Sequence, residues 1–521
     1  MSPIDFSVKD PTSIVLRGLV LAALLATPIL SARDIAVKNP GELSAALKAA
    51  GAGDSVILAK GTWTDAHLAV ERGGSPEQPL TIRAESPGET ILTGSSSLKI
   101  NAPHVTVDGL FFYHGAIRKG AVIEFNSHHG IVRNTAVVDY NPADFETKYY
   151  WVFFSGDNNL VDRCYFKGKN HLEPLIGNAI EDARYNGVLH SYIKNIPYAD
   201  ANGREDIRVW GAGKFDAGAE GGAFFTIEGN LFERADGEGA EIISLKSNHN
   251  QVLNNTVMAT RGCINIRQGS SNLIRGNIVL GQGRPGTQGL RMSGLHNTVQ
   301  GNYVSGCDYG IRVATGEYIA GALTPNYEPK HKTVNGQTVA KGAMATYAQV
   351  KDLTLSDNVT VGIKDADLEV GFEYQRHWPN EQMVLLPENC VIKNNRFVRP
   401  HGGDSVIGTI PPATPPFDQF HFAPNRYEGN QLVGGKNTFS PAAQGCASEP
   451  LPAGWTEAAE QAGFKPLTAA DVGPAWVRTF RAAGKFTMED DMSCYRAASP
   501  SGNTLEPAEN KNHPKKHART N

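Results

Sequence analysis

The sequence predicts an all-β solenoid, a parallel β-helix that ends in an irregular segment with short helices. A short phrase recurs between about residues 100 and 400: an Asn or His, four residues that include branched apolar side chains, and an Asn followed by apolar residues. Glycine is abundant, with 55 residues, and extended helical periodicity is confined to short segments. Short apolar runs with polar corners, repeated about every 20 to 30 residues, are typical of stacked β-helical coils.

The repeated phrase begins and ends at residues suited to tight corners. Its copies are His129–Asn134, Asn250–Asn255, Asn272–Asn277, Asn297–Asn302 and Asn389–Asn394, with Asn159–Cys164 as a variant. Asn tolerates a left-handed backbone, and stacked Asn side chains can form a hydrogen-bonded ladder. A β-sandwich is the alternative, but its turns would recur about every 8 to 12 residues with hairpin signals such as Asn-Gly, which are scarce here. We therefore favour the solenoid.

The composition excludes several classes of protein. The 521 residues carry 49 Lys and Arg against 53 Asp and Glu, a formal net charge of -4. Because there is no overall positive field, we expect no nucleic-acid partner, and any polyanion must bind locally. The six cysteines lack the C-x-x-C spacing of zinc sites.

The N-terminus contains a candidate export signal. Gly18 to Leu30 forms an apolar run of 13 residues, preceded by Arg17. This run is too short for the roughly 20 residues of a membrane-spanning helix, but it fits the apolar core of a signal peptide. We expect cleavage near Ala32, a signal peptide over residues 1–32, no membrane span, and export to the periplasm or the medium.

Cations recur along the coils. Five segments place a branched apolar residue beside a Lys or Arg: Ile207-Arg208, Leu245-Lys246, Ile266-Arg267, Leu290-Arg291 and Ile311-Arg312. Because neighbouring residues of a strand face opposite sides, each cation points outward when its neighbour points inward. Coils lie about 4.8 Å apart, so we expect a line of positive charge on one face. Such a line requires interleaved acids or a polyanionic ligand, and periodicity alone does not choose between a binding strip and a solvated basic face.

An acidic segment stands close to these cations. Asp236-Gly237-Glu238-Gly239-Ala240-Glu241 precedes Lys246, and Asn202-Gly203-Arg204-Glu205 lies one coil earlier. Carboxylate and amide oxygens are ligands that Ca²⁺ prefers. The same acids can instead neutralise the neighbouring cations in ion pairs, and the residues alone favour that simpler interpretation.

Several stretches of the chain are similar to one family of enzymes. They are "PLTIRAESPGETILTGSSSLKI" from Pro79, "VTVDGLFFYHG" from Val105, "GKNH" from Gly168, "NGREDIR" from Asn202, "NLFERADGEGAEIISLKS" from Asn230 and "LTAADVGPAW" from Leu467. The most specific piece has Glu241 five residues before Lys246 and Arg267 21 residues after it. The chain thus resembles polysaccharide lyase family six, the alginate lyase and chondroitinase B family, over most of residues 35–476. The resemblance implies a right-handed parallel β-helix and β-elimination on uronate-containing polysaccharides.

The resemblance also implies roles for individual residues. Lys246 matches the family's catalytic base, Arg267 its catalytic acid, and Asn202 and Glu241 two of its calcium ligands. The family usually has one residue between its two calcium glutamates, whereas two separate Glu238 from Glu241. Either Glu238 still reaches the ion through a Gly-permitted bulge, or the enzyme works without calcium. Ca²⁺ is the expected cofactor, with that question open.

The chemistry of elimination fits these residue types. Removal of the C5 proton of a uronate requires a neutral amine such as Lys246 and neutralisation of the adjacent carboxylate. Arg267 can stabilise the developing negative charge, and either Arg267 or a water that it holds donates the proton to the departing oxygen. We expect His171, Arg208 and Arg291 to bind neighbouring sugar units along the open face of the solenoid.

The C-terminal part of the chain differs from the coils. The phrase stops near residue 405, so we expect a catalytic β-helix over residues 33–405, a segment over 406–497 that packs on it, and a tail without fixed structure over 498–521. Glu457–Ala462 and Thr468–Phe480 have weak helical patterns. We expect them to cover the open end of the solenoid, which would otherwise expose an unpaired edge.

These features favour an exported lyase that cleaves an anionic polysaccharide and leaves 4,5-unsaturated uronate ends. Alginate is the first expected substrate and dermatan-type chondroitin the second. A β-helical glycoside hydrolase is an alternative; it needs paired carboxylates about 5 to 10 Å apart, for which Glu238 and Glu241 are the candidates. A non-catalytic β-helix that binds carbohydrate is a further alternative. The sequence leaves the oligomeric state open.

Overall fold

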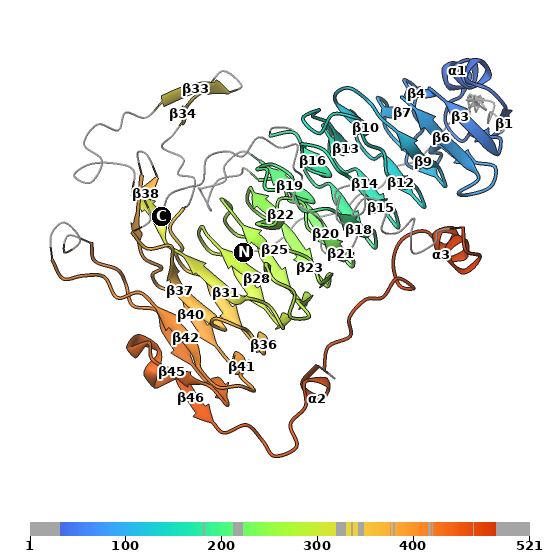
Figure 1. Ribbon diagram of the computed structural model, residues 1–521. Helices are drawn as coiled ribbons and strands as arrows, with labels where there is room; N and C mark the ends of the chain where they lie inside the picture. Colours follow the sequence, from blue (N-terminus) through green and yellow to red (C-terminus); the bar gives the residue numbers. More distant parts are fainter. Residues whose placement is uncertain are drawn as a thin grey trace, which may run out of the picture.

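The chain winds into a solenoid with three long parallel sheets, here called A, B and C (Figure 1). The computed structural model describes residues 32–485 apart from residues 181–182, 212–221, 319–329, 335–336, 342–347, 376, 379–380, 415–417, 419 and 462. Sheets A and B have 14 strands each and sheet C has 13. Consecutive strands pass from one sheet to the next, so each turn of the chain adds one strand to every sheet. The predicted all-β parallel β-helix is confirmed.

The strands of each sheet follow one another along the solenoid axis. Sheet A contains β1 (Asp34–Val37), β2 (Ser55–Leu58), β5 (Leu80–Ala84), β8 (Val105–Asp108), β11 (Ile131–Arg133), β14 (Leu160–Asp162), β17 (Gly187–Leu189), β20 (Thr226–Glu228), β23 (Gln251–Leu253), β26 (Leu273–Arg275), β29 (Thr298–Gln300), β35 (Thr354–Ser356), β40 (Val391–Lys393) and β43 (Arg426–Glu428). Sheet B contains β3 (Gly61–Thr64), β6 (Thr90–Gly94), β9 (Phe111–Gly115), β12 (Ala136–Val138), β15 (Tyr165–Lys167), β18 (Tyr192–Ile196), β21 (Leu231–Ala235), β24 (Thr256–Met258), β27 (Ile278–Leu280), β30 (Tyr303–Ser305), β36 (Val359–Val361), β41 (Arg396–Val398), β44 (Asn430–Val433) and β46 (Cys446–Glu449). Sheet C contains β4 (His67–Val70), β7 (Ser97–Ile100), β10 (Ala121–Phe125), β13 (Tyr150–Phe154), β16 (Ile176–Asn178), β19 (Ile207–Trp210), β22 (Glu241–Lys246), β25 (Gly262–Ile266), β28 (Thr287–Met292), β31 (Tyr309–Ala314), β37 (Leu368–Phe372), β42 (Asp404–Gly408) and β45 (Lys436–Asn437).

The remaining elements are short and lie outside the three sheets. A small antiparallel sheet contains β32 (Gly316–Tyr318), β38 (His377–Trp378) and β39 (Glu381–Leu385), and β33 (Lys330–Val334) pairs with β34 (Gln337–Lys341) in a hairpin. The helices are α1 (Pro40–Ala49), α2 (Glu457–Gln461), α3 (Ala475–Ala482) and the 3-10 helix η2 (Ser440–Gly445). None of the helices within the described residues has the length and apolar character needed to cross a membrane.

Branched apolar side chains fill the interior of the coils. One residue of each sheet A strand from β2 to β40 pairs with its counterpart on the next coil, and each is a fully buried Val, Ile or Leu: Val56, Ile82, Val107, Val132, Val161, Val188, Ile227, Val252, Ile274, Val299, Leu355 and Ile392. Burial of one such side chain contributes about 1.5–3 kcal/mol relative to exposure. Stacking of the coils therefore provides a large part of the stability.

Two columns of buried Asn side chains run along the corners. Between sheets A and B, each side-chain oxygen after the first accepts the backbone N–H of the Asn one coil earlier at 2.9–3.0 Å; the members are Asn230, Asn255, Asn277, Asn302, Asn358, Asn395 and Asn430. Between sheets C and A, Asn250, Asn272 and Asn297 stack in the same way at 2.8 Å. The ladder expected from the repeated phrase is present.

At the corner between sheets C and A, the residue just before each position of the Asn250–Asn272–Asn297 ladder has a left-handed backbone, and these residues form a column of their own. Its non-glycine members have φ from 48° to 61°: His104, His129, Asn158, Tyr185, Phe224, His249, Ser271, His296, Asp352 and Asn389. Two copies of the phrase begin at members of this column, His129 and Asn389, whereas the copies that begin at Asn250, Asn272 and Asn297 start one place later, in the ladder. The phrase therefore combines two structural positions that differ by one residue.

The coils continue beyond the expected end at residue 405. Strands β43 to β46 extend sheets A, B and C as far as Glu449. Asn425 and Asn430 begin and end one more copy of the phrase, and their side-chain oxygens accept N–H groups of the coil before. The spacer of this copy, Arg-Tyr-Glu-Gly, lacks the branched apolar residues that identify the other copies, which is why the sequence placed the end too early.

The segment after β46 runs back along sheet B (Figure 1). The Trp476 Nε1–H donates to the Asn134 carbonyl at 2.7 Å, and the Gly473 N–H donates to the His190 carbonyl at 2.7 Å. The segment therefore packs along the side of the solenoid instead of covering its open end, in contrast to the expectation from sequence. Apolar side chains of Phe111, Tyr165 and Tyr192 provide the surface on which α3 rests.

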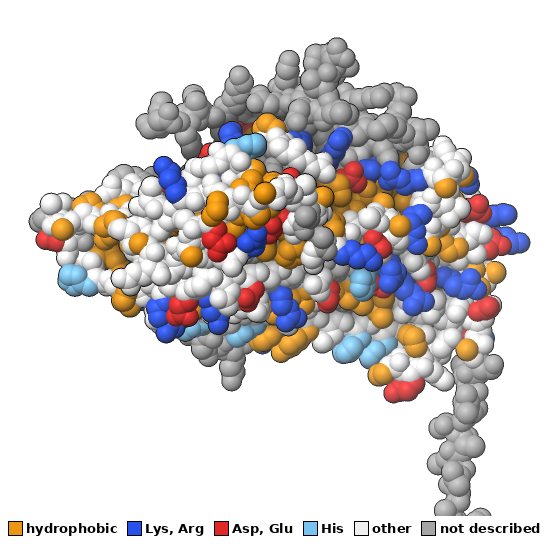
Figure 2. All heavy atoms as spheres, turned by 90° about the horizontal axis from the view of Figure 1, so that it is seen from below, with side chains coloured by type: hydrophobic (Ala, Val, Ile, Leu, Met, Phe, Trp, Pro, Cys, Tyr) orange, Lys and Arg blue, Asp and Glu red, His pale blue; other side chains and the backbone are white. Residues whose placement is uncertain are grey.

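Charge is mixed over one face of the molecule. Lys and Arg side chains are interspersed with Asp and Glu side chains on the face shown in Figure 2. The candidate signal peptide up to Ser31 and the expected tail over 498–521 lie outside the described residues.

Candidate active site

Lys246 and Arg267 lie side by side on the outer face of sheet C. Lys246 is the last residue of β22, and Arg267 directly follows β25. The register pairs Leu245 with Ile266, and the Arg267 N–H donates to the Leu245 carbonyl at 2.9 Å. The two apolar residues point inward and are fully buried, whereas the side chains of Lys246 and Arg267 are 13% and 15% exposed. The sequence spacing of 21 residues thus brings an amine and a guanidinium to equivalent positions on adjacent coils.

The other cations form a second row rather than an extension of the first. Arg208 pairs with Ser244, and Arg291 pairs with Asn265, two residues before Lys246 and Arg267 on their strands. Arg291 and Arg312 then pair directly. The single line expected from sequence is wrong, because loops and register shifts between coils absorb different numbers of residues. Residues two apart share a strand face, so both rows lie on the same surface.

Each cation of the two rows has an acidic partner. The pairs are Arg208–Glu173 at 3.2 Å, Arg208–Glu205 at 3.5 Å, Lys246–Glu205 at 2.9 Å, Arg267–Glu241 at 3.4 Å, Arg291–Glu373 at 3.0 Å and Arg312–Glu369 at 2.9 Å. These interleaved acids remove the repulsion that a bare row would create.

Three carboxylates converge beside Lys246. Oxygens of Glu205, Glu238 and Glu241 lie within 4.8 Å of one another. Glu238 Oε2 accepts the Gly203 N–H at 2.7 Å, so Glu238 folds back toward the neighbouring coil. Gly239, with φ of 75°, permits this path, and a Cβ there would meet the Tyr198 ring at 2.5 Å. Glu238 thus lies beside Glu205 and Glu241 despite the two residues between Glu238 and Glu241.

The acids of this cluster differ in protonation. Burial raises the pKa of Glu238 to about 8, with the negative charges of Glu205 and Glu241 adding to the effect. Burial acts in the same direction on Glu205, but the positive charges of Lys246 and Arg208 hold its pKa below the ordinary value. At neutral pH Glu205 is ionised and Glu238 retains its proton for much of the time.

The carboxylate cluster fits a hard divalent cation. Converging carboxylate oxygens are the usual donor set for Ca²⁺, and the three acids bring such oxygens within 4.8 Å of one another. Glu205, Glu238 and Glu241 are the residues that would hold the ion. Asn202 is exposed and precedes Gly203, the backbone donor to Glu238.

His171 does not lie on the outer face with the expected substrate-binding residues. It is fully buried, its ring is 3.9 Å from that of Tyr149, and its Nδ1 lies 2.9 Å from the Leu172 carbonyl. Burial lowers its pKa well below the usual range. The buried Lys169 Nζ donates to the His171 and Glu173 carbonyls at 2.8 and 2.6 Å. The "GKNH" stretch therefore shapes the loop that carries Glu173 to Arg208, and the assignment of His171 to substrate binding is not supported.

Sequence reasoning missed several residues of this surface. Glu205 was not assigned, although it lies three residues before Arg208 in a stretch already singled out. Trp210 pairs with Lys246, whose Nζ lies 5.0 Å from the ring centroid. Phe372 lies beneath Arg312, at 4.0 Å from its guanidinium carbon. Trp210 could have been found from the sequence, because an aromatic residue two positions after Arg208 shares its strand face. Phe372 could not, because it follows a long insertion that interrupts the sequence repeat.

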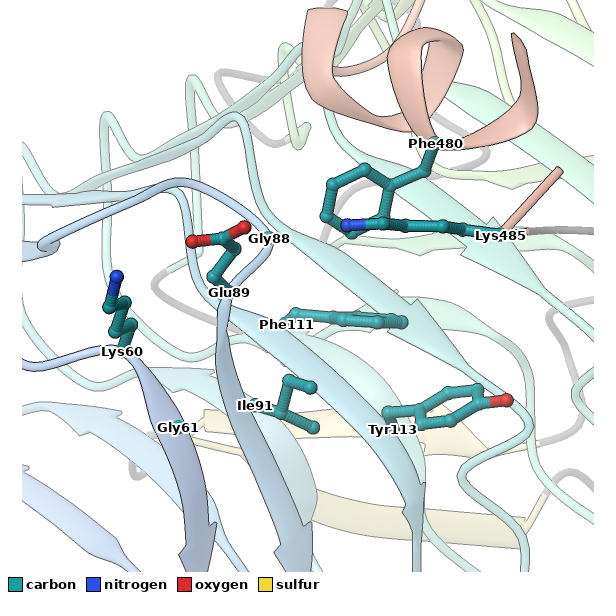
Figure 3. A pocket seen from close by; sticks show the side chains of 9 residues that line it. All are labelled: Lys60, Gly61, Gly88, Glu89, Ile91, Phe111, Tyr113, Phe480 and Lys485. Carbon is teal, nitrogen blue, oxygen red and sulfur yellow. The ribbon is translucent and has the colours of Figure 1, made fainter. Parts of the chain in front are cut away.

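A cavity of about 550 Å³ lies elsewhere, on the outer side of sheet B (Figure 3). Phe111, Tyr113 and Ile91 line its floor, and Lys60 and Lys485 stand at its rim. It shares no residue with the two rows of sheet C, so the candidate active site is the open face of the solenoid and not this cavity.

Comparison with known proteins gives consistent results. The family model described as Chondroitinase B matches residues 37–406. A PL6 family polysaccharide lyase from Pseudopedobacter saltans is 38% identical, with 85% of this chain and 99% of that chain covered and a TM-score of 0.75. A PL6 family alginate lyase is 24% identical over 85% of this chain and 58% of its own, with a TM-score of 0.69. A mannuronic acid specific family 6 lyase from human gut microbiota is 20% identical over 86% of this chain and 98% of its own, with a TM-score of 0.66. No curated protein matches.

Proposed function

Since the chain belongs to the PL6 family of polysaccharide lyases, we propose that it cleaves a uronate-containing polysaccharide by β-elimination, with alginate as the first substrate and dermatan-type chondroitin as the second. One observation carries the proposal: Lys246 and Arg267 occupy equivalent positions on adjacent coils of one sheet face. Alginate is favoured because two of the structural relatives described above are an alginate lyase and a mannuronic acid specific lyase.

Lys246 is the proposed base. As a neutral amine, Lys246 donates one N–H to Glu205, whose carboxylate oxygen lies 2.9 Å from Nζ. The lone pair of Nζ then faces the C5 proton of the sugar. Glu205 is fully buried and therefore fixes the position of Nζ. The Trp210 ring beside Nζ excludes water from one side of the amine. These contacts orient the base before the substrate arrives.

Arg267 is the proposed partner at the leaving oxygen. Its guanidinium stabilises negative charge as it develops on the sugar and on the departing O4. Arg267 or a water held by it supplies the proton that completes the elimination. The electron pair of the C5–H bond forms the C4–C5 double bond, the C4–O4 bond breaks, and one product carries a 4,5-unsaturated uronate at its non-reducing end.

Arg208 and Arg291 are the proposed binding residues for neighbouring sugar units. Both are about one-seventh exposed, at 14% and 15%, and both hold a glutamate that a substrate carboxylate can replace. Because Arg208 lies one coil before Lys246 and Arg291 one coil after Arg267, they flank the reacting unit along the solenoid.

Ca²⁺ is the proposed cofactor, held by Glu205, Glu238 and Glu241 together with Asn202. When bound, it would neutralise the substrate carboxylate as a Lewis acid. We also propose that the apolar run of residues 18–30 directs export to the periplasm or the medium.

The experiment that tests the function uses the purified protein with alginate, polygalacturonate and dermatan sulfate. β-Elimination generates ultraviolet absorbance from the unsaturated uronate as chains are cut, and we expect this signal with alginate. New reducing ends without that absorbance would indicate a hydrolase. The absence of both signals with all three polymers would indicate a binding protein and would overturn the proposal.

A further inference from the structure

Three histidines meet on the surface at the corner between sheets C and A. His104 lies between β7 and β8, and His128 and His129 lie between β10 and β11, one coil later. One ring nitrogen from each of the three lies within 4.8 Å of the other two. His128 and His129 are exposed and His104 is half-buried, so an ion from solvent can reach all three rings.

The backbone holds these rings in place. His104 and His129 occupy the left-handed column, with φ of 54° and 56°, and the His104 N–H donates to the His128 carbonyl at 3.3 Å. The ring of His104 stacks on that of His129 with centroids 4.8 Å apart, and the Nδ1 atoms of His128 and His129 are 2.8 Å apart. The ring of His128 is therefore held beside the stacked pair of His104 and His129, and one nitrogen of each ring lies within 4.8 Å of the other two.

Other coils show that aromatic rings stack at this corner without a cluster of histidines. In the same column, the rings of Tyr185, Phe224 and His249 stack at 4.9 and 4.8 Å and contribute a single imidazole. Stacking alone therefore needs no histidine cluster. Only the coils with His104 and His129 add a further histidine, His128, outside the column, among the described residues of this corner.

The chemistry of three imidazoles selects a particular class of ion. Nitrogen donors suit Zn²⁺, Cu²⁺ and Ni²⁺, whereas Ca²⁺ prefers oxygen. Two nitrogens bound to zinc at about 2.0–2.1 Å in a tetrahedral site are roughly 3.3–3.4 Å apart. A small outward shift brings the Nδ1 atoms of His128 and His129 from 2.8 Å to that separation, and the His104 ring, with a nitrogen within 4.8 Å of both, turns toward them.

We propose that His104, His128 and His129 bind one divalent transition-metal ion, with Zn²⁺ as the representative, through one nitrogen each. A water fills the fourth position. The ion cross-links two successive coils in the N-terminal half of the solenoid, on a corner separate from the Lys246 and Arg267 face. Its role is structural: binding to the folded chain alone raises the melting temperature.

The test is calorimetric titration of the chelator-treated full chain with ZnCl₂, for wild type and two matched variants. His129→Asn removes one ligand, and Asn already stands in this left-handed column at positions 158 and 389, so the fold tolerates it. His249→Asn makes the same change in the same column without touching the cluster. We expect His129→Asn to lose one zinc site, or to weaken it at least about 10-fold, and His249→Asn to titrate as wild type.

Two further readouts decide the outcome. Zinc should raise the melting temperature of wild type and of His249→Asn but not that of His129→Asn, and Co²⁺ in place of zinc should give visible absorbance that the His129→Asn variant lacks. Zinc that binds His129→Asn with the same stoichiometry and affinity as wild type overturns the proposal. An equal loss in both variants also overturns it, because the effect would then not belong to the cluster.

Discussion

Glu205 and Lys246 form an ion pair at 2.9 Å across adjacent coils of sheet C, and Glu205 is fully buried beneath it. The same carboxylate lies 3.5 Å from Arg208 and belongs to the cluster with Glu238 and Glu241. One residue thus joins the proposed base, a proposed binding residue and the proposed calcium site. We infer that Glu205 couples these three parts, and its removal should affect more than one of them.

Glu205→Gln should lower kcat by roughly 10- to 100-fold, because the amine of Lys246 loses the charge that positions it. It should also lower the free energy of unfolding by about 1–3 kcal/mol, since two cations lose a buried partner. Steady-state kinetics and urea unfolding measure the two effects. The control is Glu124→Gln, which breaks the more exposed pair with Lys99 on the same sheet and should cost at most about 1 kcal/mol. Unchanged kcat in Glu205→Gln would contradict the positioning role.

Glu238 should make stability depend on pH. Its folded pKa of about 8 exceeds the unfolded value of about 4.3, so the folded chain holds a proton that the unfolded chain releases. Its contribution is fully present below about pH 4.3 and is lost as the pH rises through about 8. In a chelating buffer, Glu238→Gln should therefore melt several degrees above wild type at pH 9, with the difference vanishing near pH 4. Equal melting temperatures of the two proteins at both pH values would show that ionisation of Glu238 does not destabilise the folded chain.

The buried Asn ladder should be essential for stability. Asn277→Ala leaves the backbone and side-chain N–H groups of Asn255 without their acceptor, and each unsatisfied buried group costs about 1–3 kcal/mol. We expect a loss of roughly 2–5 kcal/mol in urea unfolding. The matched control is Asn254→Gly at the exposed left-handed position beside Asn255, where the change should stay within about 0.5 kcal/mol. Similar losses in the two variants would contradict the ladder's contribution.

Arg291 should contribute binding rather than chemistry. It lies two residues away from the position of Arg267 on its coil and holds Glu373 at 3.0 Å. Arg291→Ala should raise KM for alginate roughly 10-fold and leave kcat within a factor of about 2, since its contact is the same in ground and transition states. Initial rates over a range of polymer concentrations separate the two constants. A fall in kcat with unchanged KM would place Arg291 in the chemical step.

The sequence predicted the fold because the solenoid repeats one physical unit. Each coil carries its own apolar strands and its own corner residues, so the pattern is visible without any long-range contact. The exceptions are the places where a coil departs from the pattern. Arg-Tyr-Glu-Gly between Asn425 and Asn430 has no branched apolar residue, and the coil is present nonetheless.

The sequence placed the site less completely. Lys246 and Arg267 were identified through the family resemblance, and the register that pairs Leu245 with Ile266 places them on adjacent coils. Arg291 was placed in the wrong row because the chain between β25 and β28 is longer than a constant repeat length predicts, so Arg291 pairs with Asn265 and not with Arg267. Glu205 was missed since Lys246 and the other two acids of its cluster come from the next coil. His171 was misplaced because a polar residue in a loop gives no sign of being fully buried.

The most direct test of the account is the turnover of alginate by Lys246→Ala, followed through the absorbance of the unsaturated uronate. We expect a loss of roughly 10²- to 10⁴-fold or more in kcat, with the melting temperature little changed because this side chain is on the outer face. Lys99→Ala, an outward lysine on the same sheet that also has an acidic partner, should retain full activity. A Lys246→Ala enzyme that keeps most of its wild-type rate would contradict the central claim that this amine removes the C5 proton.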